Sequence, residues 1–318
     1  MTFQAFSGSQ TVKNRMIAPV RAQWTARALA PDTDLNWNRD GQPDSINGAL
    51  AQTQDRTVFE QRTGIPADLA QLCEHLVAAG VRKSDAPDTA AGFALEGADA
   101  VLAFGIGWLD AIRPGADLGM IVPQFARHCL NRLLEPNFAL AGHISPDLRG
   151  AGLQILAFWD RELAGHTMTR GDWRDVQRQA MAATAKDTDP WSYRIATFIE
   201  ALAWPVRSVS REFVGLFEPF LFNWLIYCET AFMTDEERTD REHLLLAWKA
   251  MATAPRDEGV NIDFDPLESL PQSARVISVD HVMRTMDRMI AIREAARPRK
   301  DEVILDLMNG LLTLIRAA

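Results

Sequence analysis

Apolar residues recur at helical spacing through almost the whole chain, and this pattern constrains the fold more than any other feature of the sequence. One such series, with intervals of three or four residues, is Leu148, Gly152, Ile155, Trp159 and Leu163. No segment of comparable length alternates apolar and polar residues with the period of two that a half-buried strand requires. We therefore predict an all-α fold, an irregular multi-helix bundle of about eleven helices.

The composition is that of an ordinary globular protein. The chain has 318 residues, of which 47% are hydrophobic and 24% charged, and this length is enough for one large domain or two smaller ones. We expect an N-terminal helical region over residues 1–140, with an irregular loop at 30–50, and a C-terminal helical region over 141–318 that packs with the first as one globular unit. Two further connections are expected at 81–92 and 254–272, where turn-forming residues are frequent.

Charge, cysteine content and hydropathy argue against several classes of partner. A net charge of -9 lacks the basic balance of a nucleic-acid-binding protein. The most apolar segment, residues 213–232, has a longest charge-free run of ten residues, 219–228, against the ~20 residues that a membrane-spanning helix needs. The three scattered cysteines, Cys73, Cys129 and Cys228, are typical of buried thiols in a reducing compartment, so we expect a cytoplasmic protein.

Three runs in the first half, FSGSQTVKNRMIAPVRAQW, RTVFEQRTGIPADLAQL and WLDAIRPGADLGMIVPQFARHCL, resemble a set of uncharacterised bacterial proteins. These proteins combine a similar N-terminal half with an alanine-rich helical remainder, and no function comes with the resemblance. They carry a glycine- and cysteine-rich segment, followed by a histidine, before the counterpart of RTVFE. Residues 36–55 contain neither Cys nor His, so the resemblance implies a binding role here in preference to an enzymatic one.

The loop NWNRDGQPDSIN, residues 36–47, has the residue types of a calcium loop. In the register of a twelve-residue EF-hand loop, the side-chain ligands are Asn36, Asn38, Asp40, Asp44 and Asn47, with Gly41 at the turn position. However, an EF-hand ends on a bidentate Glu, and Asn47 offers one oxygen. Asn, Asp, Gly and Pro are also common turn residues. We therefore interpret this segment as a surface loop, keep calcium binding as an alternative, and expect no metal and no cofactor.

Catalytic signatures are absent from the sequence. There is no His-Glu-x-x-His motif, nucleophile elbow or phosphate-binding loop. The candidates for a site assembled only in three dimensions are His128, Glu135 and His143, which lie close together in the chain. They support an alternative hypothesis, an enzyme of hydrolase type.

Two features favour a binding role. Trp37 is an aromatic residue within a polar loop, and Arg297, Arg299 and Lys300 form a short basic run. Either could contact a partner. The sequence thus predicts a cytosolic, non-catalytic binding or protein-interaction protein whose partner, a protein or a small ligand, is unknown.

Overall fold

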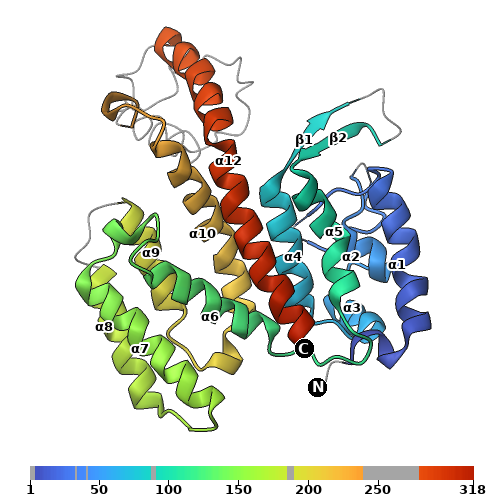
Figure 1. Ribbon diagram of the computed structural model, residues 1–318, viewed down its shortest axis with the longest axis horizontal. Coiled ribbons are helices and arrows are strands. Elements are labelled where there is room, and N and C mark those ends of the chain that lie inside the picture. Colours follow the sequence, from blue (N-terminus) through green and yellow to red (C-terminus); the bar gives the residue numbers. More distant parts are fainter. Residues whose placement is uncertain (1–3, 33, 41, 87–90, 185–189, 239–278) are drawn as a thin grey trace, which may run out of the picture. The chain divides into compact units, whose positions relative to one another are not determined.

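The computed structural model describes residues 4–32, 34–40, 42–86, 91–184, 190–238 and 279–318. The expected connection at 254–272 lies outside these residues. The chain forms two compact units, residues 1–224 with 301–318, and residues 225–300. The boundary that the sequence suggested, near residue 140, therefore falls within the first unit. The prediction of an all-α fold is confirmed, because helices make up nearly all the regular structure of the described residues (Figure 1).

The first part of the chain consists of short helices and one hairpin. In order, its elements are η1 (Ala5–Gly8), α1 (Gln10–Thr25), α2 (Ile46–Ala51), α3 (Arg56–Thr63), α4 (Ala67–Gly80), β1 (Val81–Asp85), β2 (Phe93–Gly97) and α5 (Asp99–Ala111). The second part continues with α6 (Ile121–Leu134), η2 (Ala141–His143), α7 (Pro146–Leu163), α8 (Arg170–Thr184), α9 (Pro190–Ala201), η3 (Val206–Ser208), α10 (Ser210–Thr230) and α12 (Val279–Ala317).

Side chains just before several helices fix where those helices begin. The side-chain oxygens of Ser9, Ser45, Asp55 and Ser145 each accept a hydrogen bond from the backbone amide three residues further on. Such N-caps satisfy one of the amides that the first helical turn leaves without a partner. Thr169 forms a reciprocal cap before α8: its hydroxyl accepts the amide of Asp172, whose carboxylate accepts the amide of Thr169.

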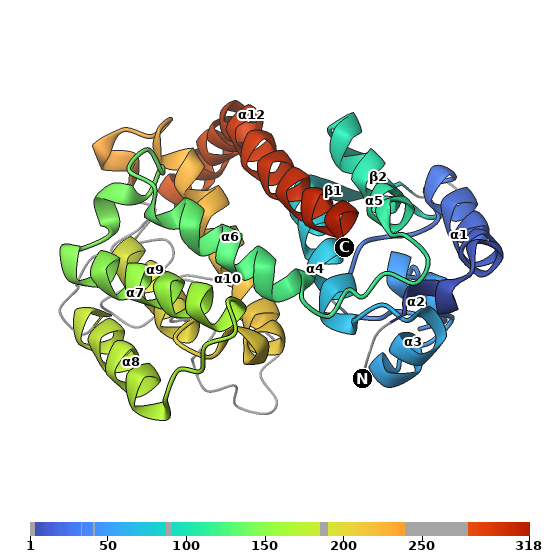
Figure 2. The same ribbon diagram turned by 60° about the horizontal axis from the view of Figure 1, so that its bottom comes forward.

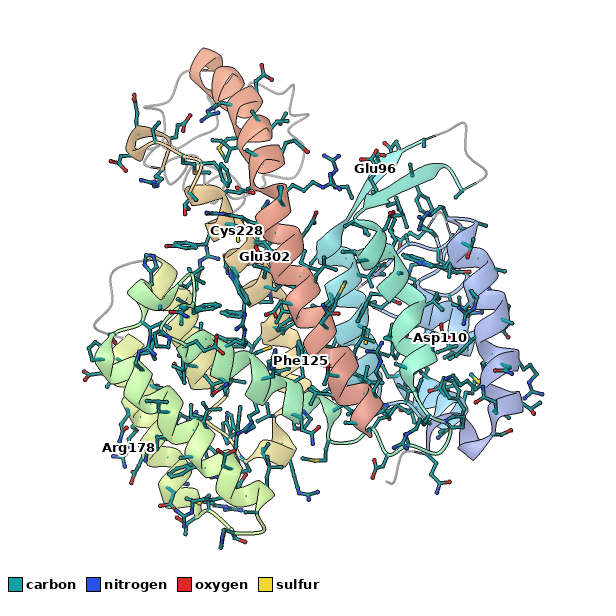
Figure 3. All side chains as sticks on the ribbon, in the orientation of Figure 1. Glu96, Asp110, Phe125, Arg178, Cys228 and Glu302 are labelled. Carbon is teal, nitrogen blue, oxygen red and sulfur yellow. The ribbon has the colours of Figure 1, made fainter. Side chains whose placement is uncertain are left out.

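The helices of the first unit meet through apolar faces. Helices α7 and α8 run side by side, as do α1 and α5 (Figures 1 and 2). On α6, Phe125 is fully buried, and its ring packs edge-on against Phe217 of α10, with 5.6 Å between ring centroids (Figure 3). At the surface, Arg21 of α1 pairs with Asp110 of α5. The core is thus aliphatic and aromatic, as the helical period predicted.

Two local features differ from the sequence-based expectation. The connection expected at 81–92 begins with a strand, because β1 and β2 pair antiparallel, Val81 opposite Gly97 and Asp85 opposite Phe93. In β1 all five residues are at least partly exposed, so it carries no apolar alternation that periodicity could detect. Proline commonly ends or kinks a helix, yet Pro298, within the basic run, lies inside the continuous helix α12. Buried Ile292, Ala296 and Ile304 keep one apolar face in phase through the proline.

No helix within the described residues is both long enough and apolar enough to cross a membrane. The three cysteines are buried and their thiols are free.

Trp224 and Trp37 provide a test of the core. Trp224 on α10 is 6% exposed and packs edge-on against Phe138, with 4.6 Å between ring centroids, whereas Trp37 is only half-buried. We expect Trp224→Ala to lower the free energy of unfolding by about 3–5 kcal/mol, because it leaves a large cavity. Trp37→Ala should lose clearly less. Urea denaturation of both variants measures the difference, and equal losses would show that Trp37 is also a core residue.

Candidate functional site

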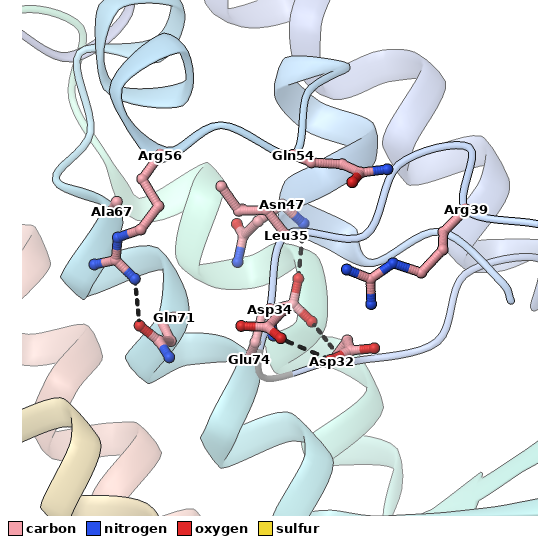
Figure 4. A pocket seen from close by; sticks show the side chains of 10 residues that line it. All are labelled: Asp32, Asp34, Leu35, Arg39, Asn47, Gln54, Arg56, Ala67, Gln71 and Glu74. Carbon is pink, nitrogen blue, oxygen red and sulfur yellow. Dashed lines mark hydrogen bonds between the residues drawn. The ribbon is translucent and has the colours of Figure 1, made fainter.

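A pocket of about 260 Å³ lies beside the segment that joins α1 to α2, in the first unit (Figure 4). We refer to this segment, residues 26–45, as the N-terminal loop. The pocket is lined by residues from the loop, from α2 and α3, and from the first half of α4. These residues are Asp32, Asp34, Leu35, Arg39, Asn47, Gln54, Arg56, Ala67, Gln71 and Glu74. Most are polar or charged, so the chemistry of this pocket suits polar groups.

The N-terminal loop is closed by hydrogen bonds at its base. The backbone amides of Asn36 and Ser45 connect the two sides: Asn36 donates to the Ser45 hydroxyl at 3.1 Å, and Ser45 donates to the Asn36 carbonyl at 3.0 Å. That carbonyl lies so close to α2 that a Cβ added to Gly48 would be 1.9 Å from it. Only glycine fits there, and the loop is therefore held firmly against the start of α2.

Glu74, on α4, anchors the loop from the other side. Its side chain is buried, with the residue 2% exposed. One carboxyl oxygen accepts the backbone amide of Asp32 at 2.9 Å, and the other accepts that of Asn47 at 2.7 Å (Figure 4). A buried carboxyl group without partners would be strongly destabilising. Here it instead joins the loop, α2 and α4 at one point.

Burial also changes the ionisation of this carboxyl group. Loss of solvation raises the pKa of Glu74 to about 8, and the neighbouring Asp32 carboxylate adds to the rise, while the amides of Asn47 and Asp32 act in the opposite direction. Desolvation dominates because the charged form loses its water. At neutral pH the pocket floor therefore holds a carboxyl group that is easily protonated.

Asn47, the second residue of α2, carries the one buried polar atom of the pocket lining that lacks a partner among the described residues. The residue is 1% exposed, and its side-chain amide nitrogen donates to the Ala70 carbonyl at 2.8 Å. This bond fixes the orientation of the amide group. Its oxygen, Oδ1, is buried without a hydrogen bond. Because buried polar atoms are nearly always paired, this oxygen points to a missing donor.

Two arginines provide the positive charge of the pocket, and in Figure 4 they lie on opposite sides of it. Arg56 is committed to neighbours on α4, since it pairs with the Asp68 carboxylate and donates to the Gln71 side chain at 2.6 Å. Arg39 is exposed, and its guanidinium forms no hydrogen bond or ion pair with the described residues. Arg39 is thus the cation that remains available to a ligand.

The residues of the predicted calcium register are used to shape the loop. Asn36 is buried, and its amide nitrogen donates to Asp32. Asp44 accepts the backbone amide of Asn38 at 2.6 Å. Asn47 lies in the first turn of α2 and lines the pocket, whereas Asp40 is exposed. Gly41 lies outside the described residues. In the part of the chain that the structure describes, no three His, Cys, Asp or Glu side chains are grouped as a metal site.

Trp37 lies beside this site. It is half-buried, and its backbone carbonyl accepts a hydrogen bond at 2.6 Å from the side chain of Gln54, which lines the pocket. Trp37 therefore stiffens the rim of the pocket but is not part of its lining.

The suggested catalytic residues lie elsewhere, and the described contacts give them structural roles. Burial lowers the pKa of His128, and its Nε2 faces Gly310 so closely that a Cβ there would be 2.8 Å away. Helix α12 thus covers this nitrogen. Glu135 influences the pKa of His128 but pairs with Arg132 at 2.7 Å. His143 lies in η2, where its carbonyl accepts the Ser192 hydroxyl.

The basic run contacts its own unit, residues 225–300. Lys300 Nζ lies 2.6 Å from the buried carboxylate of Glu229. The guanidinium of Arg299 lies 5.5 Å from the centre of the Phe232 ring, and Arg297 is 3.9 Å from Glu294. These side chains therefore have partners within their own unit, so less of their charge is available to bind another molecule.

Sequence analysis missed most of the pocket residues, above all Glu74, Asp32 and Arg39. A signal for Glu74 was present, because it lies within an otherwise apolar helix, IPADLAQLCEHLVAA. Every face of such a helix is near the core, so a carboxyl group in it needs a partner. The partners lie 42 and 27 residues earlier in the chain, and nothing in the local pattern identifies them.

Comparison of this chain with models of protein families, with curated proteins and with solved structures found no match.

The role of Glu74 can be tested by pH. The protonated form is favoured in the folded state, so its contribution to stability is complete below the unfolded pKa, near 4.5, and is lost as pH rises to about 8. Between pH 5 and 8 the wild type should lose stability relative to Glu74→Gln, by up to about 1.4 kcal/mol per pH unit. Urea denaturation at several pH values measures this, and parallel curves would contradict it.

The calcium alternative has its own test. Because Asp44 already accepts the amide of Asn38, and no three His, Cys, Asp or Glu side chains are grouped as a metal site among the described residues, millimolar calcium should leave the melting temperature unchanged. A calcium site would instead stabilise the fold, by about 2.7 kcal/mol at a hundredfold excess over the dissociation constant. Thermal denaturation with calcium and with magnesium as control makes the comparison. A rise with calcium that the double variant Asp40→Ala, Asp44→Ala abolishes would establish the calcium site.

Proposed function

We propose that this chain is a non-catalytic binding protein of the cytoplasm, and that its ligand is a small polar molecule held in the pocket beside the N-terminal loop. The observation that carries this proposal is that Asn47 lines this pocket while its buried side-chain oxygen has no partner among the described residues. Leaving such a group unsatisfied costs about 1–3 kcal/mol, and a bound ligand with a hydrogen-bond donor removes this cost.

The size and rigidity of the pocket fit this proposal. At about 260 Å³, it is slightly smaller than the roughly 300–1,000 Å³ of pockets for drug-sized ligands. Its walls are fixed before binding, because Glu74 and Ser45 bond the loop to α4 and α2. A preformed site loses little conformational entropy when a ligand binds, which favours affinity.

The chemistry of the lining supports binding without catalysis. The ten lining residues include no Ser, Thr, Cys, Lys or His, so the lining holds no hydroxyl, thiol, amine or imidazole nucleophile. The one carboxyl group with a strongly raised pKa, Glu74, has both oxygens engaged by backbone amides. Free, buried thiols support the cytoplasmic location, because secreted proteins commonly carry disulfides.

Hydrogen exchange tests the proposal with four probes of similar size: butylammonium, methylguanidinium, butyrate and butanol. At a concentration of about ten times the dissociation constant, a bound probe should slow amide exchange in peptides covering residues 30–50 and 67–80, because it stabilises the loop contacts. Exchange in α8, residues 170–184, should not change. The probe should also be recovered chemically intact. If no probe protects the loop peptides, the pocket is not a ligand site of this kind.

A further inference from the structure

The structure assigns this pocket to a ligand that carries a positively charged N–H group, an alkylammonium or a guanidinium. This inference rests on the proposed binding function, and it specifies the ligand's class. It follows from which hydrogen-bonding groups of the pocket remain unused and from the charges that surround them.

The first step is the hydrogen-bonding capacity of Asn47. Its side-chain amide nitrogen donates to the Ala70 carbonyl, and its backbone amide donates to the Glu74 carboxyl group. Both nitrogens are therefore already engaged as donors. The atom left over is Oδ1, which can only accept a hydrogen bond. An anionic group such as carboxylate or phosphate brings acceptors and would leave Oδ1 unpaired. A ligand with N–H groups satisfies it.

The second step is the charge on the walls. The acidic lining residues are Asp32, Asp34 and Glu74. Because burial raises the pKa of Glu74 to about 8, Asp32 and Asp34 are the residues that make this wall negative at neutral pH. Asp32 is held in place by the amide groups of Asp34 and Asn36. Asp34 is exposed at the rim, and its carboxylate forms no hydrogen bond or ion pair with the described residues. A cation in the pocket would therefore face an available carboxylate, and in a partly desolvated site this attraction exceeds that in open water.

The third step concerns the arginines. Arg56 is already neutralised by Asp68, and the remaining cation, Arg39, is exposed. An anionic ligand would be attracted by Arg39 and repelled by the acidic wall. A cationic ligand is attracted by the acidic wall and repelled by one solvated guanidinium. Water and salt weaken that repulsion. The balance favours the cation.

Calorimetric titration of the four probes tests this class. Butylammonium and methylguanidinium should bind more tightly than butanol, and butyrate should bind most weakly. Asn47→Ala should weaken the binding of both cations about tenfold or more, because a hydrogen bond to a charged group is lost.

Two variants at exposed positions keep the test valid if Asn47→Ala does not fold. Asp34→Asn should weaken the binding of the cations about two- to fivefold, and Arg39→Gln should strengthen it by a similar factor. The matched control is Asp40→Asn, an exposed acid on the same loop that does not line the pocket. It should leave the dissociation constants unchanged.

The outcomes separate this inference from the proposed function. If butyrate binds most tightly and Arg39→Gln weakens it, the pocket is a ligand site but its ligand is an anion, and the inference is wrong. If butanol binds as well as butylammonium, and Asp34→Asn has no effect, charge does not select the ligand, which also overturns it. If no probe binds, the proposed function fails, and this inference fails with it.

Discussion

The buried carboxyl group of Glu74 is the interaction on which the N-terminal part of this protein depends. It accepts one backbone amide from the N-terminal loop, at Asp32, and one from α2, at Asn47. Burying a carboxyl group costs free energy unless hydrogen bonds replace its water, and these two amides do so. In return, the N-terminal loop and the helix α2 that follows it are fixed to α4, and the polar pocket forms where the three segments meet.

Closing the loop and building the pocket draw on different side chains of the same segment. Asn36 and Ser45 tie the two sides of the loop together, and Asp44 holds the backbone at Asn38. The Asp44 oxygen that accepts this amide is then unavailable to a metal ion. Asp34 and Arg39 line the pocket, and their side chains form no hydrogen bond or ion pair with the residues that the structure describes. A rigid loop that presents uncommitted charges is well suited to binding a ligand, because little order has to be gained.

Elsewhere, polar groups that attract attention in the sequence are used for packing. The ring of His128 fits against Gly310, where any side chain would collide with it. Lys300 neutralises the buried Glu229 within its own unit. In both places the fold satisfies or covers the group, so the residue type alone is a poor guide to function. His128 Nε2 and Asn47 Oδ1 are both buried without a partner among the described residues. Asn47 differs because it lines a pocket.

The sequence by itself determined the fold class, because helical spacing of apolar residues reflects a local period that each segment carries on its own. The site was decided by the tertiary structure. Nothing local relates Glu74 to Asp32, 42 residues earlier, because that contact depends on how α4 packs beneath the loop. The exposed strand β1 escaped notice for a related reason: its pairing with β2, and not its own pattern, makes it a strand.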